Sequence, residues 1–147
     1  MSSPRSVLVV DDNELISRMA TDLLKRYGYN ALFALGPSQA QAILQSFLPD
    51  LIILDFFMPD MDGDQFIHWM KKHEDIRFHS IPVLGLSISQ ESENRFRLAG
   101  ANAFISKPFK EGSLVTAVEV ILGLNGWKSF STCSTCESTI CEMKKGA

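Results

Sequence analysis

The sequence of 147 residues contains no apolar run that approaches the roughly 18 residues of a membrane-spanning helix. Residues 1–5 lack the apolar stretch of a signal peptide, and a candidate strand follows them directly. Positive charge is not in excess, because 17 acidic residues outnumber 14 lysines and arginines and give a net charge of −3. That balance argues against a nucleic-acid-binding domain, which normally carries a basic face. We therefore expect a cytoplasmic protein that binds neither membranes nor nucleic acids directly.

Cysteine is absent from residues 1–132, and the three cysteines, Cys133, Cys136 and Cys141, lie near the end of the sequence. An odd number of cysteines makes a poor disulfide framework. Cys133 and Cys136 have a metal-like spacing, but a closed zinc site usually takes four ligands and no histidine is near them. We expect residues 125–147, which are rich in serine, threonine and cysteine, to form a tail without an independent fold.

Residues 1–124 have the length and composition of one globular domain, since domains commonly contain about 100–150 residues and 46% of the sequence is hydrophobic. Within this domain, short apolar runs alternate with segments of helical periodicity. The predicted strands cover residues 6–10, 30–34, 51–54, 81–86 and 103–105. The tail is too short for a DNA-binding or catalytic output domain, so we expect a stand-alone domain or a piece of a longer protein.

Five helices are predicted between and after these strands. They begin after Asn13, at Pro37, near Asp64, after Ser89 and at Ser113. The apolar face of the first helix is expected to contain Leu15, Ile16, Met19, Ala20, Leu23 and Leu24. Strands and helices in this alternation predict a doubly wound α/β fold, in which helices cover both faces of a five-stranded parallel sheet. The functional site of such a sheet lies at the carboxyl ends of its strands.

Charged and polar residues gather where the predicted strands end. They are Asp11 and Asp12 after the first strand, Asp55 after the third, Ser87 after the fourth and Lys107 shortly after the fifth. An acid at a strand end is often only the N-cap of the next helix, but Asn13 already supplies the first cap. Adjacent acids raise each other's pKa and destabilise the fold unless a cation neutralises them. The spacing therefore favours a site for a hard divalent ion such as Mg²⁺.

Lys107 and Ser87 each have an ordinary explanation, as a solvated lysine and a turn hydroxyl. Lys107, however, follows a buried strand and precedes Pro108, which restricts its backbone. A lysine beside carboxylates can pair with one of them or hold a phosphoryl oxygen as a point charge. Together with a carboxylate nucleophile, these groups are what phosphoryl transfer requires.

The same residues resemble the response-regulator receiver domain of two-component signal transduction over roughly residues 5–124. The matching segments are Val9-Val10-Asp11-Asp12-Asn13, Ile53-Leu54-Asp55-Phe56-Phe57-Met58-Pro59, Asp62-Gly63, Ser87 and Gly100-Ala101-Asn102-Ala103-Phe104-Ile105-Ser106-Lys107-Pro108-Phe109. Each segment is modest by itself, but all of them in order form a specific signature. The resemblance implies a flavodoxin-like sheet with strand order 2-1-3-4-5. It also implies a regulatory phosphoacceptor, not an enzyme, which catalyses only its own phosphorylation and dephosphorylation.

The resemblance implies that Asp55 is the phosphoacceptor, with a histidine kinase or a histidine phosphotransfer protein as phosphoryl donor. It further implies a Mg²⁺ site in which Asp12 binds the ion directly and Asp11 acts mostly through a bound water. Asp55 and the backbone carbonyl of Phe57 would supply the remaining protein ligands. A large ring at Phe57 is also expected to shield the acyl phosphate from water.

Lys107 and the hydroxyl of Ser87 are expected, by the same resemblance, to contact the phosphoryl group. Phe104 corresponds to a switch aromatic, which rotates inward when the Ser87 hydroxyl moves toward the phosphate. Ile88 departs from the small residue common in the family and is expected to narrow access to the site. A downstream protein or a second copy is expected on a face formed by the fourth helix, fifth strand and fifth helix. Its expected members are Arg95, Arg97, Ala103, Glu111, Thr116 and Glu119.

Three other functions are compatible with parts of the pattern. A phosphohydrolase with an aspartyl nucleophile would carry a second aspartate where Phe57 stands. A flavin- or nucleotide-binding module would have a first loop rich in glycine, serine or threonine, whereas Asp11 and Asp12 would repel a phosphate. A pseudo-receiver, which is a protein-interaction module that is never phosphorylated, would lack the acceptor, the acid pair or the lysine. This last function is the remaining alternative to phosphorylation at Asp55.

Overall fold

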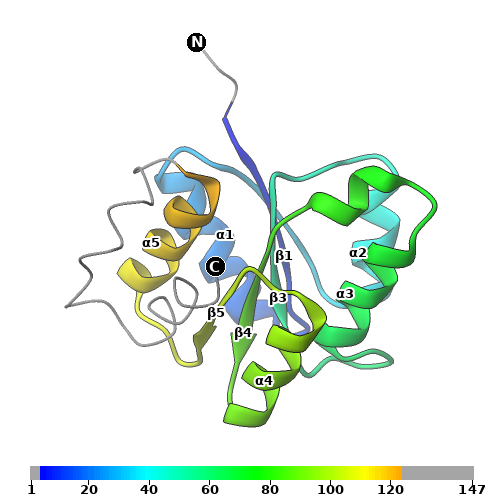
Figure 1. Cartoon of the computed structure of the whole chain (residues 1–147). Coiled ribbons are helices and arrows are strands. Elements are labelled where there is room, and N and C mark those ends of the chain that lie inside the picture. The colour runs from blue at the N-terminus through cyan, green and yellow to red at the C-terminus, as the bar shows by residue number, and fades with distance from the viewer. Residues whose placement is uncertain (1–3, 124–147) are drawn as a thin grey trace.

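The computed structural model describes residues 4–123, which form a five-stranded parallel sheet between two layers of helices (Figure 1). The strands are β1 (Ser6–Val10), β2 (Asn30–Ala34), β3 (Leu51–Asp55), β4 (Val83–Ser87) and β5 (Ala103–Ser106). The helices are α1 (Glu14–Arg26), α2 (Pro37–Leu44), α3 (Gly63–Lys72), the short 3-10 helix η1 (Ile76–Ser80), α4 (Gln90–Ala99) and α5 (Glu111–Leu122). The strand order β2-β1-β3-β4-β5 confirms the predicted flavodoxin-like fold. Within this part of the chain, no helix has the length and apolar character needed to cross a bilayer.

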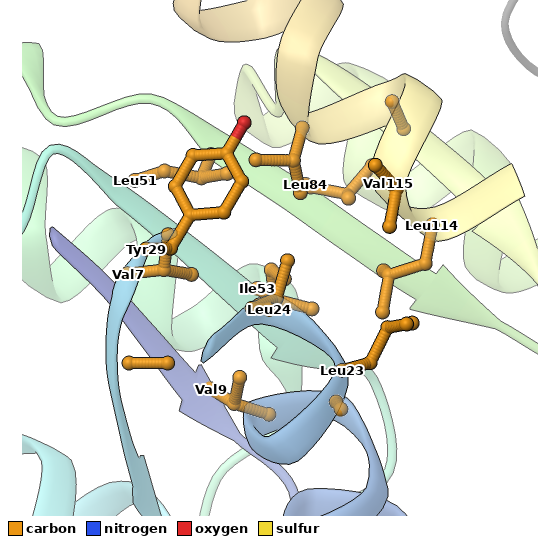
Figure 2. Packing of buried hydrophobic residues seen from close by; sticks show 14 of the residues in the cluster. Val7, Val9, Leu23, Leu24, Tyr29, Leu51, Ile53, Leu84, Leu114 and Val115 are labelled. Carbon is orange, nitrogen blue, oxygen red and sulfur yellow. The ribbon is translucent and has the colours of Figure 1, made fainter. Parts of the chain in front are cut away.

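Successive residues of the central strands point to opposite faces of the sheet and enter two separate hydrophobic clusters. One cluster lies under α1 and α5 and includes Val7, Val9, Leu51 and Ile53 (Figure 2). The other lies under α2, α3 and α4 and includes Leu8, Val10, Ile52 and Leu54. Burial on both faces explains why these strands read as continuous apolar runs in the sequence rather than as alternating patterns.

Helix α1 presents the predicted face in its later turns, where Ala20, Leu23 and Leu24 are buried, but a different one at its start. Leu15 and Met19 are 68% and 56% exposed, whereas Ser17 and Thr21 are buried. The Ser17 hydroxyl donates to the backbone carbonyl of Asp11 (2.9 Å), and the Thr21 hydroxyl donates to that of Ser17 (3.0 Å). A buried hydroxyl with a partner carries little penalty. The prediction from apolar periodicity is therefore wrong in the first two turns, where two locally satisfied hydroxyls take the inner positions.

Strand β4 begins and ends later than predicted. It covers Val83–Ser87 instead of residues 81–86, because η1 occupies the residues directly before Ile81. The later end places Ser87 within the strand, where its carbonyl accepts a hydrogen bond from the backbone N–H of Lys107 (2.7 Å). The backbones of Ser87 and Lys107 are therefore fixed to each other at the edge of the sheet.

Helix α4 is attached to the sheet mainly by one aromatic side chain, Phe96, which is fully buried. The ring occupies the space next to two glycines. A Cβ atom on Gly85 would lie 2.6 Å from the ring, and one on Gly63 would lie 2.8 Å from it. Both distances are far shorter than an ordinary van der Waals contact, so the close approach of α4 requires glycine at both positions. We call this arrangement the Phe96 socket.

The substitution Gly85→Ala is expected to lower the free energy of unfolding by about 1–3 kcal/mol, the usual effect of overpacking a core. Adding Phe96→Leu, which shortens the opposing side chain, should recover part of that loss. Gly112→Ala is the matched control, because its Cβ meets nothing within 4 Å and alanine in a helix is about 0.5–1 kcal/mol better than glycine. Urea unfolding of the four proteins measures the differences. Equal stability of Gly85→Ala and the parent would contradict the socket.

Candidate functional site

The carboxyl ends of β1 and β3 place Asp11 and Asp55 together, and Lys107 joins them. The two strands are neighbours, with Val10 opposite Leu54. Lys107 enters from the segment after β5, and its Nζ lies 2.8 Å from Asp11 Oδ2 and 3.0 Å from Asp55 Oδ1. Asp11 is fully buried and Asp55 is 6% exposed. The structure therefore brings together these three predicted site residues, although 96 positions separate Asp11 from Lys107.

Local hydrogen bonds fix the orientation of the Asp11 carboxylate. The backbone N–H of Asn13 donates to Oδ1 (2.9 Å), while Lys107 occupies Oδ2. Each carboxylate oxygen of Asp11 thus has a partner of its own. The base of Lys107 is fixed as well, through its backbone hydrogen bond to Ser87, and its peptide bond to Pro108 is cis. The protein's own hydrogen bonds therefore hold the acidic and basic groups of the site in place.

Asp11, Asp12 and Asp55 form an oxygen-donor set that fits a hard divalent cation. One carboxylate oxygen from each residue lies within 4.8 Å of the other two. Asp12 is exposed, so the set opens to solvent on one side. Carboxylate oxygens are the ligands that Mg²⁺ prefers in proteins. The contribution of the Phe57 backbone carbonyl stays a prediction from the resemblance.

One ammonium group does not neutralise two neighbouring carboxylates. Burial, and next the negative charge of Asp11, raise the pKa of Asp55 from its usual 3.8 to about 6. The hydrogen bond and charge of Lys107 oppose this rise without cancelling it. For Lys107, burial alone lowers the pKa, but its hydrogen bonds and attraction to Asp11 and Asp55 outweigh burial and raise it above its usual value. The site thus keeps Lys107 charged and leaves Asp55 short of positive charge.

Ser87 lies at the site edge of the sheet, but its hydroxyl is bonded elsewhere. Asp55 pairs with Leu86, so Ser87 is the next residue of β4 along this edge. The Ser87 hydroxyl donates to Glu93 Oε2 of α4 (3.2 Å), and the Ser106 hydroxyl donates to the same oxygen (3.3 Å). Glu93 was not predicted as a site residue, because an acid in the first turn of a helix is ordinarily explained by the helix dipole. Only the tertiary structure reveals its two serine partners.

Phe104, the predicted switch aromatic, is 5% exposed and packs in the cluster under α2, α3 and α4. The guanidinium carbon of Arg97 lies 5.1 Å from the centre of its ring. The ring is inside while the Ser87 hydroxyl is still bonded to Glu93. Burial of Phe104 therefore does not require Ser87 to move, and the rotation implied by the resemblance stays a prediction.

One member of the expected output face is buried, and a second is paired with a neighbouring helix. Arg95 turns toward α3, where its Nε lies 2.9 Å from Asp64 Oδ2 and its guanidinium carbon lies 4.8 Å from the centre of the Phe56 ring. Ala103 is only 2% exposed, because it begins β5 on the side that packs against the α1 and α5 cluster. Assigning Ala103 to a docking surface from sequence position alone is wrong, because its side chain is buried. Docking through Arg95, whose side chain is 37% exposed, stays a prediction. Docking through the rest of the α4-β5-α5 face stays a prediction.

This flavodoxin-like sheet brings three aspartates and a lysine together at the carboxyl ends of its strands. That is the architecture of a receiver domain. The sequence model described as the response regulator receiver domain matches residues 7–119. Over 121 residues the chain is 31% identical to the polar-differentiation response regulator DivK of Brucella ovis, which covers 81% of this chain and 97% of DivK. The chain belongs to the response regulator receiver domain family, as the resemblance predicted.

Solved structures show the same relationship. The chemotaxis response regulator CheY4 of Vibrio cholerae superposes with a TM-score of 0.74 at 28% identity, covering 80% of this chain and 98% of CheY4. The signal receiver domain of a signal transduction histidine kinase from Syntrophus aciditrophicus gives 0.72 at 31% identity, covering 91% and 96%. The predicted tail, with Cys133, Cys136 and Cys141, lies outside the described residues.

The substitution Asp55→Asn is expected to stabilise the metal-free protein by about 1–3 kcal/mol at about pH 7.5 and by roughly a third of that amount at about pH 4.5. Because folding raises the pKa of Asp55, the folded protein holds the proton more tightly than the unfolded chain. The resulting stability is complete below the ordinary pKa of 3.8 and is lost as the pH rises through about 6. An asparagine at position 55 cannot ionise, so the variant keeps this stability at the higher pH.

Urea unfolding in the presence of a chelator measures this pH dependence. Asp22→Asn, which changes an exposed acid of α1, is the control and should shift the unfolding curve little at either pH. A gain from Asp55→Asn of equal size at both pH values would show that ionisation of Asp55 does not limit stability.

Proposed function

We propose that the domain accepts a phosphoryl group on Asp55 from the phosphohistidine of a histidine kinase or a histidine phosphotransfer protein. The reaction needs Mg²⁺, and the phosphorylated domain changes conformation to control a partner protein. The observation that carries this proposal is that Lys107 forms ion pairs with both Asp11 and Asp55 at the carboxyl ends of the strands. It sets a nearly buried carboxylate beside a fixed positive charge.

In the proposed transfer, an ionised carboxylate oxygen of Asp55 attacks the phosphorus atom. A P–O bond forms as the P–N bond to the donor imidazole breaks, and the imidazole nitrogen leaves with the electron pair. Lys107 Nζ, 3.0 Å from Asp55 Oδ1, is placed to hold an oxygen of the transferred group. A Mg²⁺ ion held by Asp11, Asp12 and Asp55 would neutralise further negative charge on that group. Preorganised charges of this kind need no reorganisation during the reaction.

Exposed apolar side chains occur in the segments that follow the strands ending at the site. Leu15 and Met19 lie on the first turns of α1, Phe57 follows β3 and Ile88 follows β4. All four follow the carboxyl ends of strands that meet at the site, and each is exposed. We infer that the donor surface around its phosphohistidine is partly apolar and covers these side chains during transfer. That the Ile88 side chain narrows the access of the donor to Asp55 remains part of this proposal.

Incubation with acetyl phosphate and Mg²⁺ is expected to add the mass of one phosphoryl group to the parent chain. Asp55→Ala should add none, while Asp22→Ala, the exposed control acid of α1, should behave like the parent. Replacing Mg²⁺ with a chelator should abolish the addition. Intact-mass spectrometry reads all four samples. Phosphate retained by Asp55→Ala would overturn the assignment, and no addition to the parent would favour the pseudo-receiver, a protein-interaction module that is not phosphorylated.

The substitution Phe57→Asn is expected to speed loss of the phosphoryl group by about three- to tenfold, or about 1 kcal/mol of activation free energy. The Phe57 ring stands two residues after the acceptor and packs edge-on against Phe56, with ring centres 4.9 Å apart. It is 51% exposed and placed to shield the acyl phosphate from water. Dephosphorylation is followed after removal of free acetyl phosphate. Ile76→Asn, an exposed apolar residue in η1, is the control, and a slower Phe57→Asn protein would contradict the shielding role.

A further inference from the structure

A single carboxylate, that of Glu93, ties the start of α4 to the ends of two neighbouring strands. Its Oε2 accepts hydrogen bonds from the hydroxyls of Ser87 (3.2 Å) and Ser106 (3.3 Å). The two serines stand opposite each other in the register of β4 and β5, and each is the last residue of its strand. Ser87 is 1% exposed, so its hydroxyl has little water to bond instead.

The framework of the fold directs the two serines toward α4. Gly85 and Phe104 also stand opposite each other, two residues before the serines, and both face the side on which Phe96 packs. Because strand side chains alternate, Ser87 and Ser106 point to that same side. Glu93 lies three residues before Phe96 and therefore on nearly the same face of α4. The contact follows from sheet register and helix position.

We propose that Glu93 is a positioning residue, which holds the Ser87 hydroxyl away from the phosphoacceptor until the phosphoryl group arrives. By doing so, Glu93 sets how readily the domain enters its phosphorylated conformation. The inference rests on the proposed phosphorylation of Asp55 and adds to it a residue outside the acid cluster.

Competition for one proton is the basis of this role. A serine hydroxyl donates a single hydrogen, so Ser87 serves either Glu93 or a phosphoryl oxygen. Hydroxyl bonds to an ionised acceptor commonly measure about 2.5–2.7 Å. The Ser87 bond is longer, at 3.2 Å, and Glu93 Oε2 is shared with Ser106. The Ser87–Glu93 bond is therefore weak enough to be exchanged for a bond to a phosphoryl oxygen. It nevertheless lowers the apparent affinity of the domain for a phosphoryl group, because it keeps part of the population in the state in which Ser87 is bonded to Glu93.

Release of Ser87 would also loosen the first turn of α4. The buried residues of this helix are Ser92, Phe96 and Ala99, so the Phe96 socket is its main apolar attachment. The side-chain bonds of the first turn between Ser89 and Ser92 are local to the helix. Loss of the Ser87–Glu93 hydrogen bond at the end of β4 would thus change how firmly the start of α4 is held.

A simpler effect has to be separated from positioning. The Glu93 carboxylate also repels an incoming phosphoryl group directly, whatever the Ser87 hydroxyl does. Positioning acts through the hydroxyl and disappears in a Ser87→Ala background, whereas charge repulsion persists there. Measuring a Glu93 substitution both in the parent chain and in the Ser87→Ala background therefore distinguishes positioning from charge repulsion.

Beryllofluoride with Mg²⁺ is the probe, because it mimics an acyl phosphate without turnover, and calorimetry of the full chain gives its affinity. Glu93→Ala is expected to bind it about tenfold more tightly than the parent, since a hydrogen bond to a charged group is removed from the competing state. Glu93→Gln keeps a weaker acceptor and should gain about threefold. Glu91→Gln removes the same charge from an exposed position of the same turn and should match the parent. In the Ser87→Ala background, Glu93→Ala should have no effect.

The hydrogen bond itself is tested without any phosphoryl mimic. In urea unfolding, Ser87→Ala and Glu93→Ala should be non-additive, with a coupling of about three- to tenfold in the unfolding equilibrium constant. Additive effects would overturn the proposal, whether or not the protein accepts phosphate.

The remaining outcomes are also decisive. An unchanged affinity in Glu93→Ala, or a gain that persists in the Ser87→Ala background, would overturn the positioning role while leaving phosphorylation of Asp55 intact. A parent chain that neither binds beryllofluoride nor accepts phosphate from acetyl phosphate would contradict the proposed function, and the switching role of Glu93 would fall with it. Even then, non-additive effects of Ser87→Ala and Glu93→Ala on urea unfolding would show that the Ser87–Glu93 hydrogen bond exists and that only the phosphorylation is absent.

Discussion

The ion pairs of one ammonium with two carboxylates govern this site. Lys107 Nζ reaches both Asp11 and Asp55, which the parallel pairing of β1 and β3 brings together. Burial, and next the negative charge of Asp11, keep the pKa of Asp55 raised despite its 3.0 Å contact with the lysine. The same lysine is fixed through its backbone to Ser87. The acid cluster, Lys107 and the Ser87 backbone are therefore parts of one connected arrangement, and a divalent cation bound there would supply the positive charge that it lacks.

Helices α5 and α4, which lie on opposite faces of the sheet, are held by very different means. Helix α5 buries five side chains, and four of them, Leu114, Val115, Ala117 and Val118, belong to the cluster that it shares with α1. Helix α4, on the other face, depends on Phe96 in its socket, with Arg95 paired to α3 on one flank and Glu93 bonded to the strand ends on the other. Polar contacts of this kind are exchanged at lower free-energy cost than a buried apolar layer. Of these two helices, α4 is thus the one displaced at lower free-energy cost.

Features that depend on local pattern could be predicted from the sequence. The run Leu51–Leu54 shows a strand buried on both faces, and Asp55 directly after it must stand at the carboxyl edge. Features that depend on tertiary geometry could not. Nothing in the order of residues shows that Ser17 is satisfied by the Asp11 carbonyl and displaces Leu15 from the inner face of α1. The same holds for Glu93 and Arg95, whose partners lie in other elements and become apparent only when α4 is placed over the sheet.

The shortage of positive charge at Asp55 links the site to the lifetime of the protein. A ligand that binds only the folded chain stabilises it by mass action, and the gain grows with the free concentration of that ligand. A divalent cation at this edge also relieves the charge imbalance that opposes folding. Proteolysis commonly acts on transiently unfolded molecules, whose number falls as folding stability rises. A cation bound at this edge would therefore raise the amount of intact domain as its concentration rises.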